Sequence, residues 1–503
     1  MKLYSLLKGI KCRIFGTTIL NIAGLYHKDT EVKENGLFFC LHGTRVDGTE
    51  FVKSAVKNGA VAVVTEQEIP RLYGVTQVIV KNARETMSLI AGKFYGSPSE
   101  KLKIIGVTGT NGKTTISTLI FNGLELLGKK CAVIGTNGII FVGQKFETNM
   151  TTPDPIELHK FFSYFVKKKI EYVIMEVSAH AIDLFKVESI IFEQVIFTNL
   201  TEDHLDYFKT MEKYFKAKQK LFAKKYAKLA IINIDDEYGK RIFDSINLPS
   251  FTYSKLEKNA NLRLFNSKRE DVFQKFNVGF KILNNINANF GIENDTTNSG
   301  YQNFEMKTYL LGSFNLSNIL AVISSLKNLG YTLDEISNVV CRLKPIDGRF
   351  NTYFVNGKIF VVDYAHTPDG LYNILNACKE IASKNKLISV FGCGGNRETQ
   401  KRKIMGEISS NLADFTIITS DNPRFESREN IAKEIESGMK NKNYTIVLDR
   451  AKAIKYAEKL AKTGDIVCIA GKGAENYIEE NGEKIPYSDK AEVEKLMQSK
   501  NCK

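Results

Sequence analysis

The stretch Gly106-Val107-Thr108-Gly109-Thr110-Asn111-Gly112-Lys113-Thr114-Thr115 decides the fold of this chain. The apolar residues 104–107 are typical of a buried strand, and apolar residues at helical spacing follow the stretch. Glycines in the turn allow backbone N–H groups to approach an anion, and the helix N-terminus adds the positive end of its dipole. The stretch therefore predicts a strand, a phosphate-binding loop and a helix.

Two side chains at the start of the predicted helix give this loop its chemistry. Lys113 can reach the outer phosphates of a nucleotide, and the Thr114 hydroxyl can ligate Mg²⁺. The loop glycines are closer together than in the standard Walker motif, but an ordinary strand-to-helix corner has no need of Gly-Lys-Thr. We interpret the segment as a site for ATP or a close relative. Its predicted binding residues are Gly109, Thr110, Asn111, Gly112, Lys113, Thr114 and Thr115.

Composition narrows the class of protein. A chain of 503 residues favours about three domains, and 43% hydrophobic with 25% charged residues is typical of globular proteins. The eight cysteines contain no C-x-x-C pair, so neither a disulfide framework nor a zinc cluster is predicted. Reduced thiols suit a cytoplasmic protein, and we expect no signal peptide and no membrane span. The net charge of +14 comes from scattered lysines without a basic aromatic stripe, so we expect no nucleic-acid partner.

The order of apolar segments predicts an α/β fold with three domains. Residues 1–100 hold short strands and helices and end near a Gly/Ser/Pro cluster at 96–99. Residues 101–345 alternate strands and helices as in a parallel-sheet P-loop ATPase domain, and residues 346–503 repeat this alternation as a Rossmann-like domain. The expected strands span residues 131–135, 172–176, 195–199, 229–233, 359–363, 387–391, 415–419, 445–448 and 466–470. For residues 255–300 we expect edge strands and a long loop.

Polar clusters follow two of the central strands. One contains Glu176 and the other His204, and the carboxyl ends of parallel strands are where ligands bind. Either residue alone reads as a polar side chain satisfied by hydrogen bonds. Beside a phosphate loop, the pair supports the hypothesis of a second Mg²⁺ near the γ-phosphate.

On four motifs, the chain resembles the Mur ligases over essentially its full length. The motifs are the phosphate loop, Glu-Val-Ser-Ala-His at 176–180, Asp-His-Leu-Asp at 203–206 and Asp-Tyr-Ala-His-Thr-Pro-Asp at 363–369. The resemblance implies an ATP- and Mg²⁺-dependent amide ligase of peptidoglycan precursor synthesis that works through an acyl-phosphate. It is similar to the members that add meso-diaminopimelate to UDP-N-acetylmuramoyl-L-alanyl-D-glutamate, with a UDP-sugar-binding N-terminal domain, an amino-acid-binding C-terminal domain and a monomeric state.

The resemblance implies roles around the nucleotide. Thr114 is expected to bind one Mg²⁺, and Glu176 with His204 the other, while Lys113 serves the phosphates. Lys218 matches the lysine that this family carbamylates to N6-carboxylysine, although the sequence alone reads it as a surface lysine. Asn315 matches the adenine side, Arg349 a phosphate contact and Asp363 a ribose contact.

The resemblance also implies a binding site for the nucleotide-sugar substrate. Its members are Thr30, Thr44, Arg45 and Val46 for the uridine diphosphate, and Thr151, Thr152, Ser178 and Lys186 for the muramoyl-peptide. Two positions depart from the family pattern, because Glu31 replaces a cation and Lys186 replaces an Arg, which loses the planar fork.

For the incoming amino acid, Asp421-Asn422-Pro423-Arg424 is similar to the form found in diaminopimelate-adding members. In that form the Arg binds the distal carboxylate, although the four residues alone are also compatible with a simple turn. Arg397, Gly471 and Glu475 match the remaining contacts, with Glu475 on the distal ammonium. Ala474 stands where the family usually has His.

Other functions stay open at this point. A relative with L-lysine or another amine as acceptor, or of the folyl-polyglutamate type, differs from this prediction in its amino-acid dependence. An ATP-binding module without turnover would release no phosphate in the presence of both co-substrates. A nucleic-acid-dependent NTPase would respond to DNA or RNA.

Overall fold

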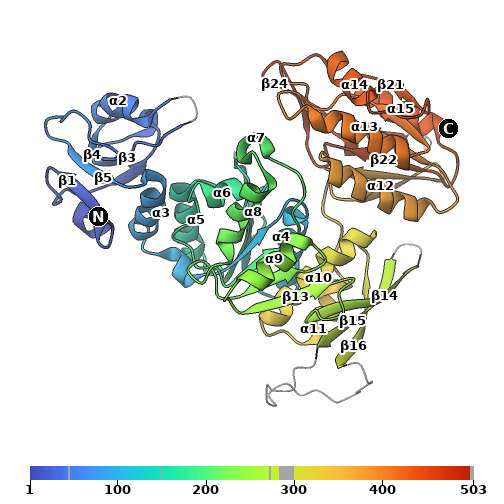
Figure 1. Cartoon of the computed structure of the whole chain (residues 1–503), viewed down its shortest axis with the longest axis horizontal. Helices are drawn as coiled ribbons and strands as arrows, with labels where there is room; N and C mark the ends of the chain where they lie inside the picture. The colour runs from blue at the N-terminus through green and yellow to red at the C-terminus, as the bar shows by residue number, and fades with distance from the viewer. Residues whose placement is uncertain (44–45, 149, 271–272, 282–299, 499–503) are drawn as a thin grey trace. The chain divides into compact units, whose positions relative to one another are not determined.

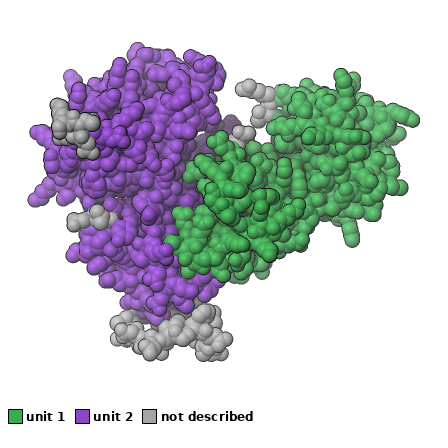
Figure 2. Space-filling view, turned by 180° about the vertical axis from the view of Figure 1, so that it is seen from behind, with its two compact units in different colours: residues 1–109, 120–198, 212–251 green, residues 110–119, 199–211, 252–503 purple. Residues whose placement is uncertain are grey.

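The computed structural model describes residues 1–43, 46–148, 150–270, 273–281 and 300–498. The chain forms two compact units, coloured separately in Figure 2: residues 1–109, 120–198 and 212–251, and residues 110–119, 199–211 and 252–503. Three large sheets with helices follow one another along the described chain (Figure 1), so the predicted α/β class with three domains is confirmed. The predicted boundaries near residues 100 and 345 stay predictions. In the described ranges, no helix combines the length and the apolar character that crossing a membrane requires.

The N-terminal sheet has the strand order β1–β5–β4–β3–β2. Its strands are β1 (Cys12–Phe15), β2 (Gly24–Tyr26), β3 (Gly36–Phe39), β4 (Ala60–Thr65) and β5 (Thr76–Val80). Neighbours from β2 to β5 are parallel, and β1 runs antiparallel to β5. Side chains alternate between the faces, so Leu37 and Phe39 pack towards α1 (Leu3–Leu7) and α3 (Ala83–Phe94), and Phe38 packs towards α2 (Val52–Lys57).

The central sheet contributes the order β12–β11–β6–β10–β7–β8–β9 to the first unit. The strands are β6 (Lys103–Thr108), β7 (Cys131–Gly135), β8 (Gly138–Phe141), β9 (Gln144–Phe146), β10 (Tyr172–Glu176), β11 (Gln194–Phe197) and β12 (Ala230–Asn233). Neighbours from β12 to β7 are parallel, as the predicted alternation requires. The antiparallel pairs β7–β8 and β8–β9 were not predicted, because strands this short carry too few residues for a periodic signal.

The second unit carries an antiparallel meander. Its strands are β14 (Leu262–Glu270), β15 (Phe273–Lys281) and β16 (Tyr301–Thr308), and β14 also pairs in parallel with β13 (Ser250–Ser254). Strands expected within residues 255–300 are therefore present as β14 and β15. Residues 271–272 and 282–299, part of the expected loop, lie outside the described residues. The helices α10 (Ser313–Asn328) and α11 (Leu333–Val340) follow the meander.

The C-terminal sheet has the order β17–β18–β22–β19–β20–β21. Its strands are β17 (Asn351–Val355), β18 (Lys358–Asp363), β19 (Leu387–Phe391), β20 (Phe415–Ile418), β21 (Tyr444–Ile446) and β22 (Ile466–Ala470). Neighbours from β18 to β21 are parallel, which confirms the Rossmann-like prediction. The antiparallel edge strand β17 was not predicted.

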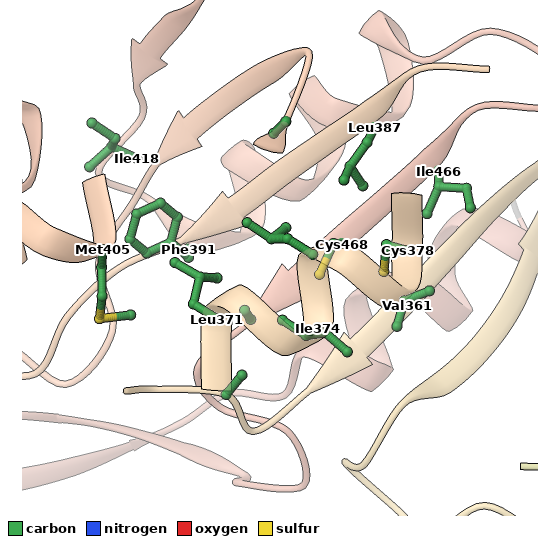
Figure 3. Close-up of a cluster of buried hydrophobic side chains, with 14 of the residues drawn as sticks. Val361, Leu371, Ile374, Cys378, Leu387, Phe391, Met405, Ile418, Ile466 and Cys468 are labelled. Atoms are coloured by element: carbon green, nitrogen blue, oxygen red, sulfur yellow. The ribbon is translucent and has the colours of Figure 1, made fainter. Parts of the chain in front are cut away.

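Helices cover both faces of this C-terminal sheet. On one face lie α12 (Pro368–Ala382), α13 (Gln400–Leu412) and α14 (Arg428–Glu436), and on the other α15 (Arg450–Leu460) and α16 (Asp489–Gln498). Figure 3 shows Leu371 and Ile374 of α12 gathered with Phe391 and Cys468 of the strands. Because β18, β22, β19 and β20 are parallel, the loops after them emerge at one edge of the sheet.

Candidate active site

The predicted phosphate loop, residues 109–112, connects β6 to α4 (Lys113–Leu126). Gly109 has φ 153° and Gly112 has φ 86°, both in the left-handed region that favours glycine. A Cβ on Gly112 would lie 2.9 Å from Asn318 Oδ1. The backbone angle therefore favours glycine at position 112, and a Cβ there would also require the Asn318 side chain to shift.

Residues that follow β11 hold the backbone of this loop. Asn199 accepts from Thr110 N through its carbonyl and from Asn111 N through Oδ1, both at 2.9 Å. Thr201 N donates to Thr110 Oγ1 at 3.0 Å. Asn199 thus positions the loop, a role that sequence analysis missed. The signal was an amide residue two positions after the end of β11, the strand that neighbours β6.

The first residues of α4 lie among cationic side chains. Lys113 Nζ donates to the carbonyl of Thr110 at 2.8 Å, which keeps the ammonium over the loop backbone. Arg349 Nη2 donates to Thr114 Oγ1 at 3.4 Å, and the guanidinium also lies 4.5 Å from the ring centre of Tyr364. Positive groups at a helix N-terminus are suited to phosphate oxygens.

Lys218, on α8 (Met211–Gln219), is buried at 1% exposure. Its Nζ donates to the carbonyl of Gly109 at 2.9 Å and lies 4.8 Å from the ring centre of Tyr214. The reading of Lys218 as a solvated surface lysine is therefore wrong. The structure brings this residue to the phosphate loop.

Glu176 ends β10 and is 1% exposed. Thr136, which follows β7, donates its N–H to Glu176 Oε1 at 2.8 Å and its hydroxyl to Oε2 at 3.2 Å. The Thr152 hydroxyl donates to the Glu176 carbonyl at 2.9 Å and accepts from Ser178 N at 3.2 Å. Thr136 thus orients the carboxylate, while Thr152, a predicted substrate contact, links the Glu176 backbone to that of Ser178.

Lys186 lies beside the same group. Its Nζ is 3.0 Å from Asp154 Oδ1 and donates to the Thr152 carbonyl at 3.3 Å, although the residue is only 7% exposed. Thr151 reaches the cluster through a hydroxyl contact with Thr136 at 3.2 Å. The structure therefore brings Thr151, Thr152, Ser178 and Lys186 together around the end of β10.

His204 precedes α7 (Leu205–Phe208) and has φ 57°. Its side chain is 43% exposed, and Nε2 lies 3.4 Å from Asp203 Oδ2. The backbone N–H of His204 donates to Asp203 Oδ1 at 2.9 Å. Asp203 therefore orients both the backbone and the imidazole of the predicted metal ligand.

Asn315 and Asp363 are both buried. Asn315 Nδ2 donates to the Leu311 carbonyl at 2.8 Å, which fixes the amide at the start of α10. Asp363 ends β18 and accepts from Phe350 N at 2.8 Å and Ala365 N at 2.7 Å. Burial raises the pKa of Asp363, and these two N–H groups oppose that shift.

The predicted uridine contact Thr30 lies in the short 3-10 turn Asp29–Glu31. Glu31, the departure from the family pattern, accepts a hydrogen bond from Lys28 Nζ at 2.8 Å. This ion pair holds the pKa of Glu31 below its usual value. The anion at position 31 is therefore balanced by a nearby cation.

The next predicted uridine segment is described only in part. Thr44 and Arg45 lie outside the described residues. Val46 is 44% exposed, and its carbonyl accepts from Gly43 N at 3.1 Å. Val46 is therefore accessible at the surface of the N-terminal α/β sheet region.

A cavity of about 190 Å³ lies at the edge where β18, β19, β20 and β22 end. Its lining includes residues that the resemblance assigned to the incoming amino acid: Arg397, Asp421, Asn422, Arg424, Gly471 and Glu475. These residues come from three separate loops of the sequence. The parallel sheet brings them together because its strands end at one edge.

One end of this cavity is a network of charged and amide groups. Asn422 Nδ2 donates to Glu475 Oε2 at 3.0 Å, and Lys472 Nζ donates to Asn422 Oδ1 at 2.9 Å and Glu475 Oε2 at 3.0 Å. Lys472 is fully buried and was not predicted from sequence. The signal available was its place between two glycines directly after β22.

Arg424 has φ 52° and two anchored guanidinium nitrogens. Its Nε donates to Glu479 Oε2 at 3.0 Å, and its Nη1 donates to the Gly395 carbonyl at 2.7 Å. Among the described residues, none accepts a hydrogen bond from Nη2. The Nη1–Nη2 edge thus retains donors for a carboxylate in the cavity that Arg424 lines.

A buried ion pair braces the strand ends behind this cavity. Arg450 Nε and Nη2 donate to the two oxygens of Asp489 at 2.7 Å, and both side chains are fully buried. Arg450 also donates to the carbonyls of Ser420 at 3.2 Å and Ala470 at 2.9 Å. These carbonyls immediately precede Asp421 and Gly471, so the pair fixes two cavity loops.

Family profiles match the chain in three consecutive segments. They are described as the Mur ligase family catalytic domain over residues 21–95, the Mur ligase middle domain over 107–326 and the Mur ligase glutamate ligase domain over 348–473. Together these three segments, which do not overlap, cover most of the chain.

Two curated relatives and one solved structure cover nearly the whole chain. UDP-N-acetylmuramoyl-L-alanyl-D-glutamate--2,6-diaminopimelate ligase 1 of Clostridium acetobutylicum is 40% identical over 98% of both chains. The ligase of the same name from Aquifex aeolicus is 39% identical over 96% of this chain and 95% of its own. A solved structure of a UDP-N-acetylmuramoyl-L-alanyl-D-glutamate--2,6-diaminopimelate ligase has a TM-score of 0.69 at 29% identity and covers 100% of both chains.

Proposed function

This chain belongs to the Mur ligase family, and on that premise we propose that it joins meso-diaminopimelate to UDP-N-acetylmuramoyl-L-alanyl-D-glutamate with ATP hydrolysis to ADP and phosphate. The product is a muramoyl-tripeptide precursor of peptidoglycan. Full-length relatives are named for these two substrates, and the phosphate loop and the cavity at the strand ends support the chemistry.

The identity of the acceptor amino acid is inferred from one observation: Arg424 and Glu475 line the same cavity. Diaminopimelate has an ammonium and a carboxylate at its distal end. A site that binds this end needs one anionic and one cationic group. The Nη1–Nη2 edge of Arg424 suits the carboxylate, and the Glu475 carboxylate suits the ammonium. L-Lysine lacks the distal carboxylate, so it would leave the Arg424 edge without its partner.

On the nucleotide side, Lys113 and the N–H groups of residues 109–115 would bind the ATP phosphates. The D-glutamyl γ-carboxylate attacks the γ-phosphorus, the bond to the β-phosphate oxygen breaks, and ADP leaves. Two anions repel each other in this step, so positive charge fixed at the helix start lowers its barrier. Arg349 would add a further cation to the phosphates, with Asn315 and Asp363 at the adenosine.

The amine of the acceptor then attacks the acyl-phosphate carbon. A tetrahedral intermediate forms, loses a proton from nitrogen, and expels phosphate as the amide carbonyl is restored. Exclusion of water from the site protects the acyl-phosphate from hydrolysis. Thr30, Thr44, Arg45, Val46, Thr151, Thr152, Ser178 and Lys186 would hold the nucleotide-sugar during both steps.

We include two Mg²⁺ ions in the proposal: Thr114 would hold one, and Glu176 with His204 the other. Hydroxyl and carboxylate oxygens are ligands that Mg²⁺ prefers, so most of this donor set fits. When bound, the ions neutralise phosphate charge. The proposal places the protein in the cytoplasm as a monomer without nucleic-acid partners.

Lys218 would add an anion next to the phosphate loop. The neutral amine of a lysine can attack CO₂. An N–C bond forms at Nζ, one proton leaves to solvent, and the product is a carbamate. This N6-carboxylysine turns a cation into a ligand-like oxyanion.

An acceptor screen tests the proposal. The purified protein is supplied with ATP, Mg²⁺ and the muramoyl-dipeptide, and phosphate release is measured with meso-diaminopimelate, L-lysine, L-glutamate or no amine. We expect release above background only with meso-diaminopimelate. Preference for L-lysine or L-glutamate would assign another acceptor class, and no release with any amine would favour an ATP-binding module.

A further inference from the structure

Glu479, in β23 (Tyr477–Glu480), contacts Asn422 and Arg424 in the loop that follows β20. Its backbone N–H donates to Asn422 Oδ1 at 2.9 Å, and its carbonyl accepts from Arg424 N at 3.0 Å. Its Oε2 accepts from Arg424 Nε at 3.0 Å. One residue therefore holds the amide of Asn422 and both the backbone and the side chain of Arg424.

The backbone contacts stabilise an unfavourable conformation of Arg424. Its φ of 52° is uncommon for a residue with a long side chain. Arg424 N donates to the Glu479 carbonyl, and Asn481 N donates to the Arg424 carbonyl at 2.7 Å, so the loop pairs with β23 on both sides of the residue. This pairing fixes the backbone of Arg424 and therefore the direction of its Cα–Cβ bond.

The side-chain contact determines which edge of the guanidinium is available. Arg424 is 21% exposed at its side chain, and without fixed partners a long arginine side chain can adopt many rotamers. By occupying Nε, the Glu479 carboxylate leaves Nη2 and the second Nη1 hydrogen as a bidentate edge. A ligand carboxylate then binds without ordering the arginine, which preserves affinity.

We propose that Glu479 is a positioning residue that makes the acceptor site selective for amino acids with a second, distal carboxylate. This inference rests on the proposed function. Glu479 acts through Arg424, because it is Arg424 and not Glu479 that lines the cavity. Its effect therefore falls on acceptor binding and not on the nucleotide.

The same strand offers a matched control. Glu480, the next residue, accepts from Arg428 Nε at 2.8 Å and also pairs with Nη2 of that arginine. Its side chain and that of Glu479 are equally exposed, at 28%. Loss of the Glu480 side chain removes a carboxylate–arginine pair of the same strand without touching Arg424.

The test compares Glu479→Ala, Glu479→Gln and Glu480→Ala with the natural chain. Loss of a hydrogen bond to a charged group should raise the KM for meso-diaminopimelate in Glu479→Ala by about tenfold, with kcat and the KM for ATP within about twofold. Glu479→Gln keeps an oxygen for Arg424 Nε and should restore most of the affinity. Glu480→Ala should leave the acceptor KM unchanged.

Three outcomes overturn the inference: an unchanged or lowered acceptor KM in Glu479→Ala, an equal rise in Glu480→Ala, or a fall in kcat alone. Thermal unfolding of each variant identifies a general folding defect, and Glu479→Gln then provides the decisive comparison. Failure of the proposed function is separate, because the natural chain itself would then not use meso-diaminopimelate.

Discussion

Lys218 donates a hydrogen bond from Nζ to the carbonyl oxygen of Gly109 at 2.9 Å, across 109 residues of sequence. Gly109 begins the phosphate loop, and Asn199 fixes the following residues of that loop. The loop is therefore held by contacts from distant parts of the chain. The proposed roles of Lys218 and Lys113 follow from this arrangement and can be tested separately.

Lys113→Ala should abolish most of the ligase activity. Removal of the ammonium leaves the developing phosphate charge without its fixed counter-charge, a loss on the order of 10²–10³ in kcat. Amine-dependent phosphate release measures the effect. Lys130→Ala, at an exposed position, is the control and should retain full activity. Normal turnover by Lys113→Ala would contradict the phosphate-binding role.

Lys218 should carry a carbamate in the active protein. With ¹³CO₂ we expect one protein-bound carbamate resonance in the ¹³C NMR spectrum, and Lys218→Arg should remove it because a guanidinium does not react with CO₂. Activity of the natural chain should fall when CO₂ is excluded and recover on addition of bicarbonate. A resonance that persists in Lys218→Arg would assign the modification to another lysine.

Arg424→Lys should weaken acceptor binding while leaving ATP binding intact. An ammonium keeps the charge but lacks the planar bidentate edge and the Nε contact with Glu479. We expect the KM for meso-diaminopimelate to rise about tenfold or more. The KM for ATP serves as the internal control, and the prediction fails if both constants change together.

Arg450→Met should destabilise the C-terminal domain. The substitution leaves the Asp489 carboxylate buried without its partner, at a cost of about 3–5 kcal/mol in the free energy of unfolding. Urea unfolding measures the loss, and the double variant Arg450→Met/Asp489→Leu should recover part of it. The exposed pair Lys452–Asp449 is the comparison, since Lys452→Met should change stability by less than about 1 kcal/mol.

His159 should make the chain less stable in mild acid. Burial lowers the pKa of His159 to about 4, and its Nε2 lies 2.6 Å from Ser189 Oγ, while no described residue partners Nδ1. As the pH falls from about 6.5 to about 4, the unfolded chain takes up a proton that the folded chain does not. The contribution of neutral His159 to the free energy of unfolding is fully present above pH 6.5, is lost as the pH falls towards 4, and amounts to about 3 kcal/mol at most.

Comparison of variants isolates this term from other titrating groups. His159→Gln has no group to protonate at this position, so its free energy of unfolding should fall less between pH 7 and pH 5 than that of the natural chain. Urea unfolding at both pH values gives the difference. Parallel pH dependence in the two proteins would show that His159 does not contribute.

Local patterns in the sequence were sufficient to predict the parallel strands at the centre of the second and third sheets. Strands such as β19 and β22 are continuous apolar runs bounded by helices, and they were predicted with their observed limits. The hairpin β8–β9 and the edge strand β17 were missed, because short edge strands are defined by pairing with a neighbour and carry little pattern of their own.

Site residues divide in the same way. The residues of the phosphate loop could be identified from sequence because glycines and Gly-Lys-Thr encode both conformation and chemistry over a few adjacent positions. Lys472, Asn199 and Glu479 could not, because each acts through a partner on another loop. The local signals at Lys472 and Asn199 do not show which distant partner each residue contacts.

The sequence by itself determined the α/β class and the glycine-rich strand, loop and helix around residues 106–115, because backbone conformation and helix periodicity depend on neighbouring residues. The tertiary structure decided that Lys218 is buried at the loop and that Arg424 presents one particular edge to the cavity. Burial and side-chain orientation depend on residues far apart in the chain, which only the packed sheets bring into contact.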